Sequence, residues 1–110
     1  MRWDNLSGRT ERRLPIAVAV RLEGLETEGA EEPKDETTYT DNLSAHGVRV
    51  HSTRLWHPRE RAEITPLNQE FPVRGEVVYC QKSDDTRFFV GLKFPQRRIP
   101  WPILKRFDGI

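Results

Sequence analysis

Two arginines separated by three residues, Arg9 and Arg13, stand just ahead of the first apolar run of this sequence. A guanidinium group offers a planar fork of N–H donors that matches a phosphate, and its plane can also stack on a base. The spacing alone is weak, because arginine supplies 14 of the 18 basic residues and such pairs then arise by chance. Its place adds weight: residues 1–13 show no apolar period, which predicts a flexible arm that can order around an anion.

A second group, Asn42-Leu-Ser44-Ala-His-Gly47, is more specific. Asn42 and Ser44 lie two residues apart at the end of an expected strand, so their side chains share one side of it. Both can hydrogen-bond a base edge or a phosphate oxygen. Gly47 can take a positive φ in a tight turn and lets a ligand approach the backbone. The alternative is a polar hairpin turn in which Asn42 and Ser44 bond their own backbone.

Catalysis and metal binding find little support in the residue pattern. Cys80 is the single cysteine, which excludes an internal disulfide and an all-cysteine zinc site within the chain. It ends an apolar strand, where a buried or half-buried thiol is commoner than a nucleophile. His46, His51 and His57 show no metal-ligand spacing, and no hydrolase, zinc-protease or P-loop motif occurs. We therefore expect no enzyme activity, no metal and no cofactor.

The net charge of +1 over 110 residues combines an acidic stretch with a basic remainder of the chain. Residues 23–36 hold seven acids and one lysine, so the rest of the chain carries 17 basic and 10 acidic residues. We expect a surface loop or long hairpin tip at 24–36, which would repel a long polyanion. With no apolar stretch of roughly 18 residues and no signal-peptide block, the sequence predicts a soluble, cytoplasmic protein.

Period-two alternation of apolar residues predicts six strands, at 16–23, 37–43, 47–52, 61–66, 71–80 and 86–94. Turns are expected at 44–47, 68–69 and 83–85, with a longer connection at 53–60. Short strands at this spacing, without helical patterns between them, predict an all-β fold, a small six-stranded antiparallel barrel. The domain plan is an arm at 1–13, a barrel at 14–95, and a tail or short helix at 96–110.

The same alternation predicts the face of the strand on which individual side chains lie. Arg49, between Val48 and Val50, is expected on the outer face of its strand. Tyr79 is expected on the same face as three strand neighbours, Val73, Gly75 and Val77. The roles of Trp56 and Trp101 stay open between core packing and a stacking surface. Because a barrel this small is filled by side chains, function is expected on its outer surface, its loops or the arm.

These motifs together resemble the PilZ domain family, whose members bind the bacterial second messenger cyclic di-GMP. The family's N-terminal R-x-x-x-R, its [D/N]-x-S-x-x-G and the glycine-containing pattern of its late strand occur here in order, over about residues 9–95. The matching residues are Arg9 and Arg13, then Asn42, Ser44 and Gly47, then Val90-Gly-Leu-Lys-Phe94. The resemblance implies a PilZ-type, split-barrel-like fold that binds the nucleotide through Arg9, Arg13, Asn42, Ser44 and Gly47, with Arg12 and Arg49 as secondary candidates.

Two positions depart from the family pattern. His46 stands where many members have glycine, and Gly8 precedes the first motif arginine. In the family, the residue before that arginine bears on whether one ligand or a stacked pair is held, so the ligand stoichiometry stays open.

The resemblance implies a stand-alone receptor in which the nucleotide orders the arm and a partner protein reads the change. One alternative is a PilZ-like interaction module that holds no nucleotide. Another is a small barrel that binds RNA or single-stranded DNA through a basic face. The intact motif residues favour the receptor, and the acidic stretch disfavours nucleic acid.

Overall fold

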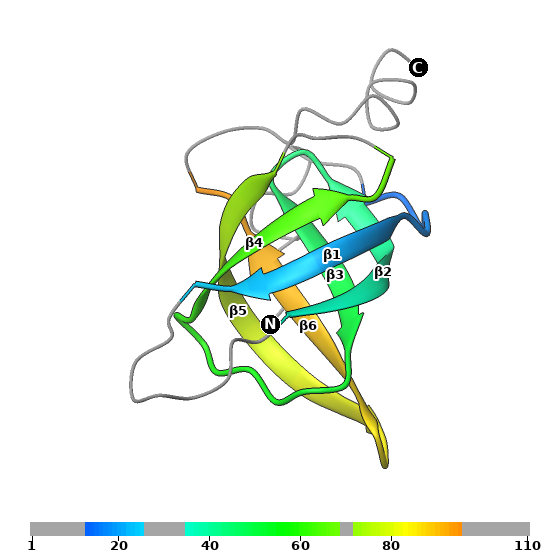
Figure 1. Ribbon diagram of the computed structural model, residues 1–110, viewed down its shortest axis with the longest axis vertical. Coiled ribbons are helices and arrows are strands. Elements are labelled where there is room, and N and C mark those ends of the chain that lie inside the picture. The colour runs from blue at the N-terminus through cyan, green and yellow to red at the C-terminus, as the bar shows by residue number, and fades with distance from the viewer. Residues whose placement is uncertain (1–12, 26–34, 69–71, 96–110) are drawn as a thin grey trace.

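Six antiparallel strands close into a barrel in the computed structural model, which describes residues 13–25, 35–68 and 72–95 (Figure 1). They are β1 (Ala19–Gly24), β2 (Asp35–Ser44), β3 (Gly47–Ser52), β4 (Arg61–Pro66), β5 (Val73–Asp84) and β6 (Arg87–Lys93). Around the barrel the order is β1-β2-β3-β6-β5-β4, and β4 pairs back with β1. The predicted all-β barrel is confirmed. The predicted helix or tail at 96–110 lies outside the described residues, as do residues 1–12 of the arm.

The interior of the barrel is filled by side chains that alternate along each strand. Val20, Leu22, Val50, Ile64 and Val90 are all 0% exposed. The bulkiest buried side chain is Trp56, from the connection between β3 and β4, which is 1% exposed and donates its indole N–H to the Ser52 hydroxyl at 2.9 Å. Trp56 is therefore a core residue, stabilised by both burial and a satisfied polar tip.

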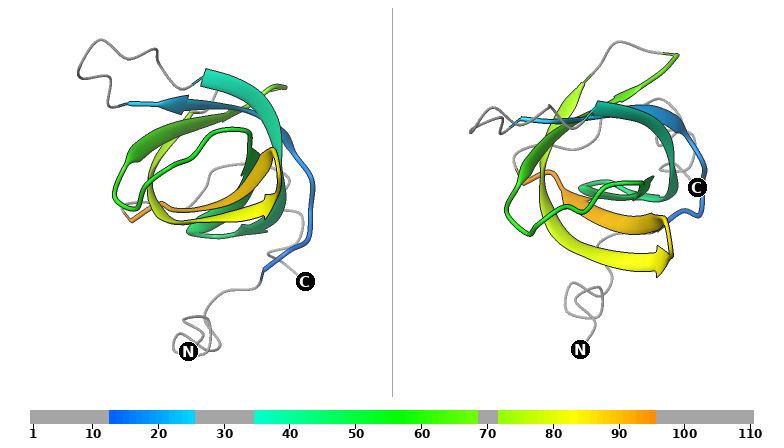
Figure 2. Two further views of the ribbon diagram at one scale, coloured as in Figure 1. Left: turned by 90° about the horizontal axis from the view of Figure 1, so that it is seen from below. Right: turned by 60° about the horizontal axis from the view of Figure 1, so that its bottom comes forward.

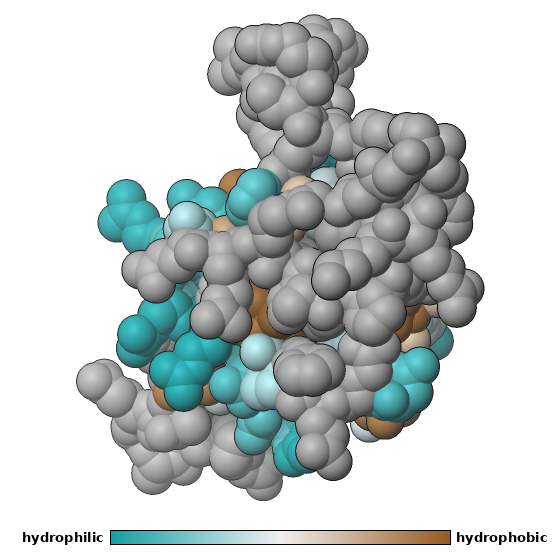
Figure 3. Space-filling model, turned by 90° about the horizontal axis from the view of Figure 1, so that it is seen from above, coloured by the Kyte–Doolittle hydropathy of each residue, from teal (hydrophilic) through white to brown (hydrophobic). Residues whose placement is uncertain are grey.

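Most described side chains on the face shown in Figure 3 are hydrophilic, with a few hydrophobic ones visible between them. Four large apolar side chains of the described residues do reach the surface, namely Tyr39, Leu55, Leu67 and Val78. Within the described ranges no helix is long and apolar enough to cross a membrane.

The segment before β1 runs along the outside of the barrel wall instead of extending the first strand (Figure 2). The Thr40 hydroxyl accepts from the Val18 amide and donates to the Ile16 carbonyl, both at 2.9 Å. A side chain thus takes the place of part of the backbone ladder, so β1 begins at Ala19 and not at residue 16. Leu14 forms an isolated bridge with Leu43 through hydrogen bonds of 2.7 and 2.9 Å.

The β1–β2 hairpin is longer than the sequence predicted. β2 begins at Asp35, inside the expected acidic loop, where Asp35 pairs with Glu23 of β1 and its carboxylate accepts from Arg21 at 3.1 and 3.2 Å. This hydrogen bond lowers the pKa of the Asp35 carboxyl and raises the pKa of Arg21. Residues 26–34 lie outside the described part of the chain. By contrast, β3 and β4 have the predicted bounds.

β5 differs from its prediction in length and in the face that one residue occupies. It continues to Asp84, and the turn moves to 85–86 because the Asp84 carboxylate accepts from the Thr86 amide at 2.9 Å. The register with β6 shifts between Val77 and Tyr79. This bulge inserts an extra residue, Val78, so Tyr79 turns to the outer face. The prediction that Tyr79 shares a face with Val77 is therefore wrong.

Candidate functional site

A hydrogen bond joins the two sequence motifs on the outer wall of the barrel. Arg13 Nη1 donates to Asn42 Oδ1 at 2.9 Å, although 29 residues separate the two along the chain. The bridge between Leu14 and Leu43 places them there, because each motif residue directly precedes one member of that bridge. Leu14 and Leu43 point into the core, and Arg13 and Asn42 lie half-buried at the surface.

A second bulge sets the orientation of Asn42. The pairing of β2 with β3 shifts between Thr40 and Asn42, so Asp41 is the extra residue on β2. Thr40 and Leu43 are buried, whereas Asp41 and Asn42 between them are both partly exposed. Two adjacent polar side chains therefore reach the outer surface, where regular alternation would have shown one.

Ser44 and Gly47 close the hairpin between β2 and β3, and the turn comes where the sequence predicted it. Ser44 is 1% exposed, and its hydroxyl points to the Gly47 carbonyl at 3.4 Å, as in a polar turn. Gly47 does not have a positive φ, so the conformational reason given for it from the sequence is wrong. A Cβ on Gly47 would lie 3.1 Å from the Leu92 carbonyl oxygen, so the glycine allows β6 to approach closely.

Arg49 faces outward on β3, opposite Asn42 in the β2–β3 pairing. Its Nε donates to Asp41 Oδ1 at 2.8 Å, and this hydrogen bond raises the pKa of the guanidinium. Its Cζ lies 4.7 Å from the centre of the Phe89 ring, a cation–π distance. Tyr79 makes a smaller contribution to the raised pKa of the same guanidinium. Arg49 thus contacts Asp41, the acid supplied by the bulge, and Phe89.

Aromatic rings extend this surface beyond Arg49. Tyr39 stacks on His51 with 4.4 Å between ring centres, and Phe89 meets His51 edge-on at 5.0 Å. His51 Nε2 lies 3.0 Å from Asp41 Oδ2 and must donate, because a carboxylate only accepts. Its Nδ1 is buried and, among the described residues, has no hydrogen-bond partner.

Of the predicted site residues, the structure brings Arg13, Asn42 and Arg49 together. It turns Ser44 toward its own hairpin, and Arg9 and Arg12 lie outside the described residues. Sequence reasoning missed Asp41, Tyr79, Phe89, His51 and Tyr39 as members of this surface. The outward position of His51 was available from alternation on β3, but those of Asp41 and Tyr79 depend on bulges.

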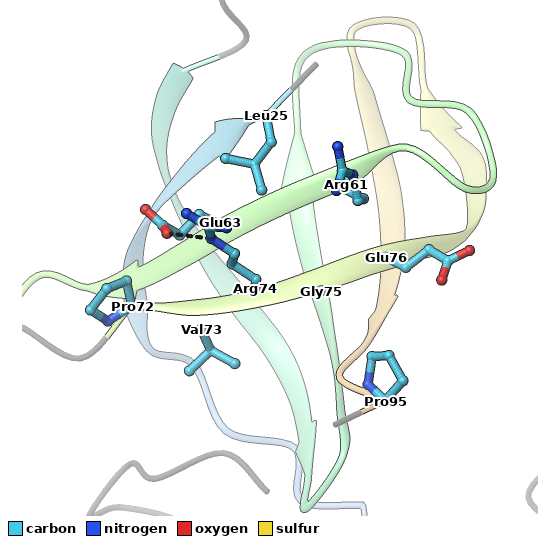
Figure 4. Close-up of a pocket in the computed structure, with 9 residues that line it drawn as sticks. All are labelled: Leu25, Arg61, Glu63, Pro72, Val73, Arg74, Gly75, Glu76 and Pro95. Carbon is cyan, nitrogen blue, oxygen red and sulfur yellow. Dashed lines mark hydrogen bonds and ion pairs between the residues drawn. The ribbon is translucent and has the colours of Figure 1, made fainter. Parts of the chain in front are cut away.

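The pocket in Figure 4 lies elsewhere, over β4 and β5. Arg61, Glu63, Arg74 and Glu76 contribute to its lining, and Arg74 Nε binds Glu63 Oε2 at 3.3 Å. None of the predicted site residues lines it. Its charges are of both signs and partly paired with each other, so it presents no concentrated field to a doubly charged ligand.

The part of the chain described by the structure contains no group of three or more histidine, cysteine, aspartate or glutamate side chains placed to hold a metal ion. Cys80 is half-buried, and its sulfur lies 3.4 Å from the Trp56 amide nitrogen, which donates to it.

Comparison with known proteins gives one family and a fold. The model of the PilZ domain matches residues 7–99. Among solved structures, the Bacillus subtilis inhibitor of motility, MotI/DgrA, is similar with a TM-score of 0.59 and 15% sequence identity, over 81% of this chain. This chain spans 43% of the length of that protein, and the likeness shows the shared fold. No curated protein sequence matches.

Proposed function

This chain belongs to the PilZ domain family, and from that membership we propose that it is a receptor for cyclic di-GMP. Arg9 and Arg13 would bind the phosphates and guanines of the nucleotide from the N-terminal side. Asn42, with Ser44 and Gly47 beside it, would bind the nucleotide from the barrel wall. Arg12 and Arg49 are secondary contacts.

The observation that carries this proposal is the hydrogen bond of 2.9 Å between Arg13 and Asn42. It brings a cation of one motif and a hydrogen-bonding amide of the other to one place on the surface. A compact dianionic ligand needs donors that converge in this way, because each phosphate is bound by positively charged groups whose N–H donors point at its oxygens.

The affinity expected from these groups is moderate. Charge-assisted hydrogen bonds contribute roughly 1.5–3 kcal/mol each, and ordering a chain segment costs about 2–5 kcal/mol. A few such contacts, less the ordering cost, correspond to a dissociation constant on the order of micromolar. A receptor that must release its ligand as the cellular concentration falls works in this range.

We propose that the output is a rearrangement of the arm, read by a protein partner in the bacterial cytoplasm, with no chemistry done on the nucleotide. Leu14 is already fixed to Leu43 by two backbone hydrogen bonds. The ligand would therefore act on residues N-terminal to Arg13, while the barrel itself serves as a fixed support.

Calorimetric titration with cyclic di-GMP tests the proposal. The wild type is expected to bind, Arg13→Ala to lose detectable binding, and Arg74→Ala, which removes an exposed arginine on β5, to bind as the wild type does. A folded wild type that shows no binding would favour the interaction module. Oligonucleotide binding that weakens steeply with salt, without an effect of the dinucleotide, would favour a nucleic-acid barrel.

A further inference from the structure

We propose that Arg49 is a preformed platform on which one guanine of the ligand stacks, held in place by Asp41 and Phe89. This inference rests on the proposed function and assigns Arg49 a specific role in it: a flat, fixed surface for a base.

The geometry of the guanidinium group supports a platform. Its N–H donors lie in its own plane, so hydrogen-bond partners sit at its edge and ring contacts sit on its faces. Asp41 occupies the edge at Nε, where its Oδ1 accepts a hydrogen bond at 2.8 Å. Cζ of Arg49 lies over the Phe89 ring, 4.7 Å from the ring centre, which is a ring contact of the cation–π kind. Since 37% of the side chain is exposed, part of it is open to solvent, and in this proposal that part includes the face turned away from Phe89.

The position of Arg49 supports a ligand contact at that open face. Arg49 is paired across β2 and β3 with Asn42, which itself binds Arg13. One cross-strand step therefore separates the platform from the residues that join the two motifs. A base held by the open face would lie next to phosphates held by Arg13 and Asn42, within one compact ligand.

The contacts of the Arg49 side chain already restrict its rotamers in the folded protein, so stacking a base on it loses less conformational entropy. A free arginine loses much rotamer entropy when it stacks, and here the contacts with Asp41 and Phe89 fix its position beforehand. Asp41 is in this view a positioning residue, because it binds Arg49 and not the base. Stacking on an aromatic or guanidinium plane depends on shape, and a lysine at the same position offers charge without a plane.

The test is the calorimetric affinity for cyclic di-GMP of Arg49→Lys, which keeps the charge and removes the plane. We expect a loss of about tenfold, close to that of Arg49→Ala, and no loss in the matched control Arg74→Lys. Phe89→Leu, which removes the support and leaves Arg49 in place, is expected to weaken binding in the same direction. Thermal unfolding of each variant shows whether it is folded at the titration temperature.

A spectroscopic measurement separates stacking from a structural effect. In the wild type, the ring current of a stacked guanine is expected to move the Nε–H resonance of Arg49 upfield as cyclic di-GMP is added. Wild-type affinity in Arg49→Lys, or an Nε–H resonance that does not move, would overturn the platform and leave the proposed function standing. A wild type that does not bind would overturn both.

Discussion

The ring of Tyr79 lies directly on the backbone of Gly91. A Cβ built on Gly91 would fall 2.7 Å from Cζ of that ring and 2.8 Å from Cδ2, closer than packed atoms come. The two residues face each other in the β5–β6 pairing, and Gly91 in turn faces Arg49 on β3. The glycine therefore makes room for the ring to cross β6 toward Arg49. This gives a physical reason for the glycine in the Val90-Gly-Leu-Lys-Phe94 pattern.

Gly91→Ala is expected to lower the free energy of unfolding by about 1–3 kcal/mol, the usual cost of forcing an extra methyl into a packed site. In a Tyr79→Ala background the ring is gone, and the same substitution should cost much less. Urea denaturation of the four proteins gives this double-mutant cycle. Equal costs in the two backgrounds would show that Tyr79 is not what the methyl group meets.

Asn42→Asp is expected to keep the affinity for cyclic di-GMP within about threefold, because the side chain still offers an oxygen acceptor to Arg13. Asn42→Leu should lose at least about tenfold, since a charge-assisted hydrogen bond is worth roughly 1.5–3 kcal/mol. Calorimetry on both variants is the measurement. If Asn42→Leu binds as the wild type does, Asn42 has no part in holding the ligand.

The effect of cyclic di-GMP on amide hydrogen exchange should differ between the residues before Arg13 and those after it. Cyclic di-GMP is expected to slow exchange of the amides of residues 1–12. The Leu14 amide should be slow with or without ligand, because it donates to the Leu43 carbonyl at 2.7 Å. Amides of residues 1–12 that are equally slow in the free protein would contradict an ordering step.

The stabilisation from the Arg21–Asp35 pair should depend on pH. The hydrogen bond from Arg21 lowers the pKa of Asp35 in the folded state. Its contribution is therefore present above the unfolded-state value of about 4 and is lost as the pH falls through the lowered folded value. We expect Asp35→Asn to have a slightly lower urea midpoint than the wild type at neutral pH, and the difference to disappear as the pH falls through the lowered folded-state pKa of Asp35.

A suitable control for this pair is Asp85→Asn, at an exposed acid in the β5–β6 turn. It should change little at either pH. A difference between Asp35→Asn and the wild type that persists unchanged in acid would show that something other than the ionised pair is responsible.

The sequence predicted the barrel well wherever alternation ran without interruption. β3 and β4 have the predicted bounds, and Arg49 faces outward between Val48 and Val50 as expected. Patterns of alternation reflect which residues a strand buries, and this information is local.

The prediction of which side chains face outward failed at two bulges. Val78 and Asp41 each add one residue to a strand, and the register of the partner strand decides where the addition is accommodated. The outward turn of Tyr79 and the contact between Asp41 and Arg49 follow from these two residues. Single-sequence periodicity carries no signal for such a choice. The nucleotide contacts of Arg9, Arg12, Arg13, Asn42, Ser44 and Gly47 stay predictions.

The bridge between Leu14 and Leu43 anchors the chain at the point where the N-terminal residues join the barrel. Leu14 is 9% exposed and packs in the same core as Leu43, so the chain directly after Arg13 is anchored in the barrel core and not in a loop. In the proposed receptor, a partner bound ahead of Arg13 would respond to the nucleotide on the far side of a point that Leu14 and Leu43 anchor in the barrel core.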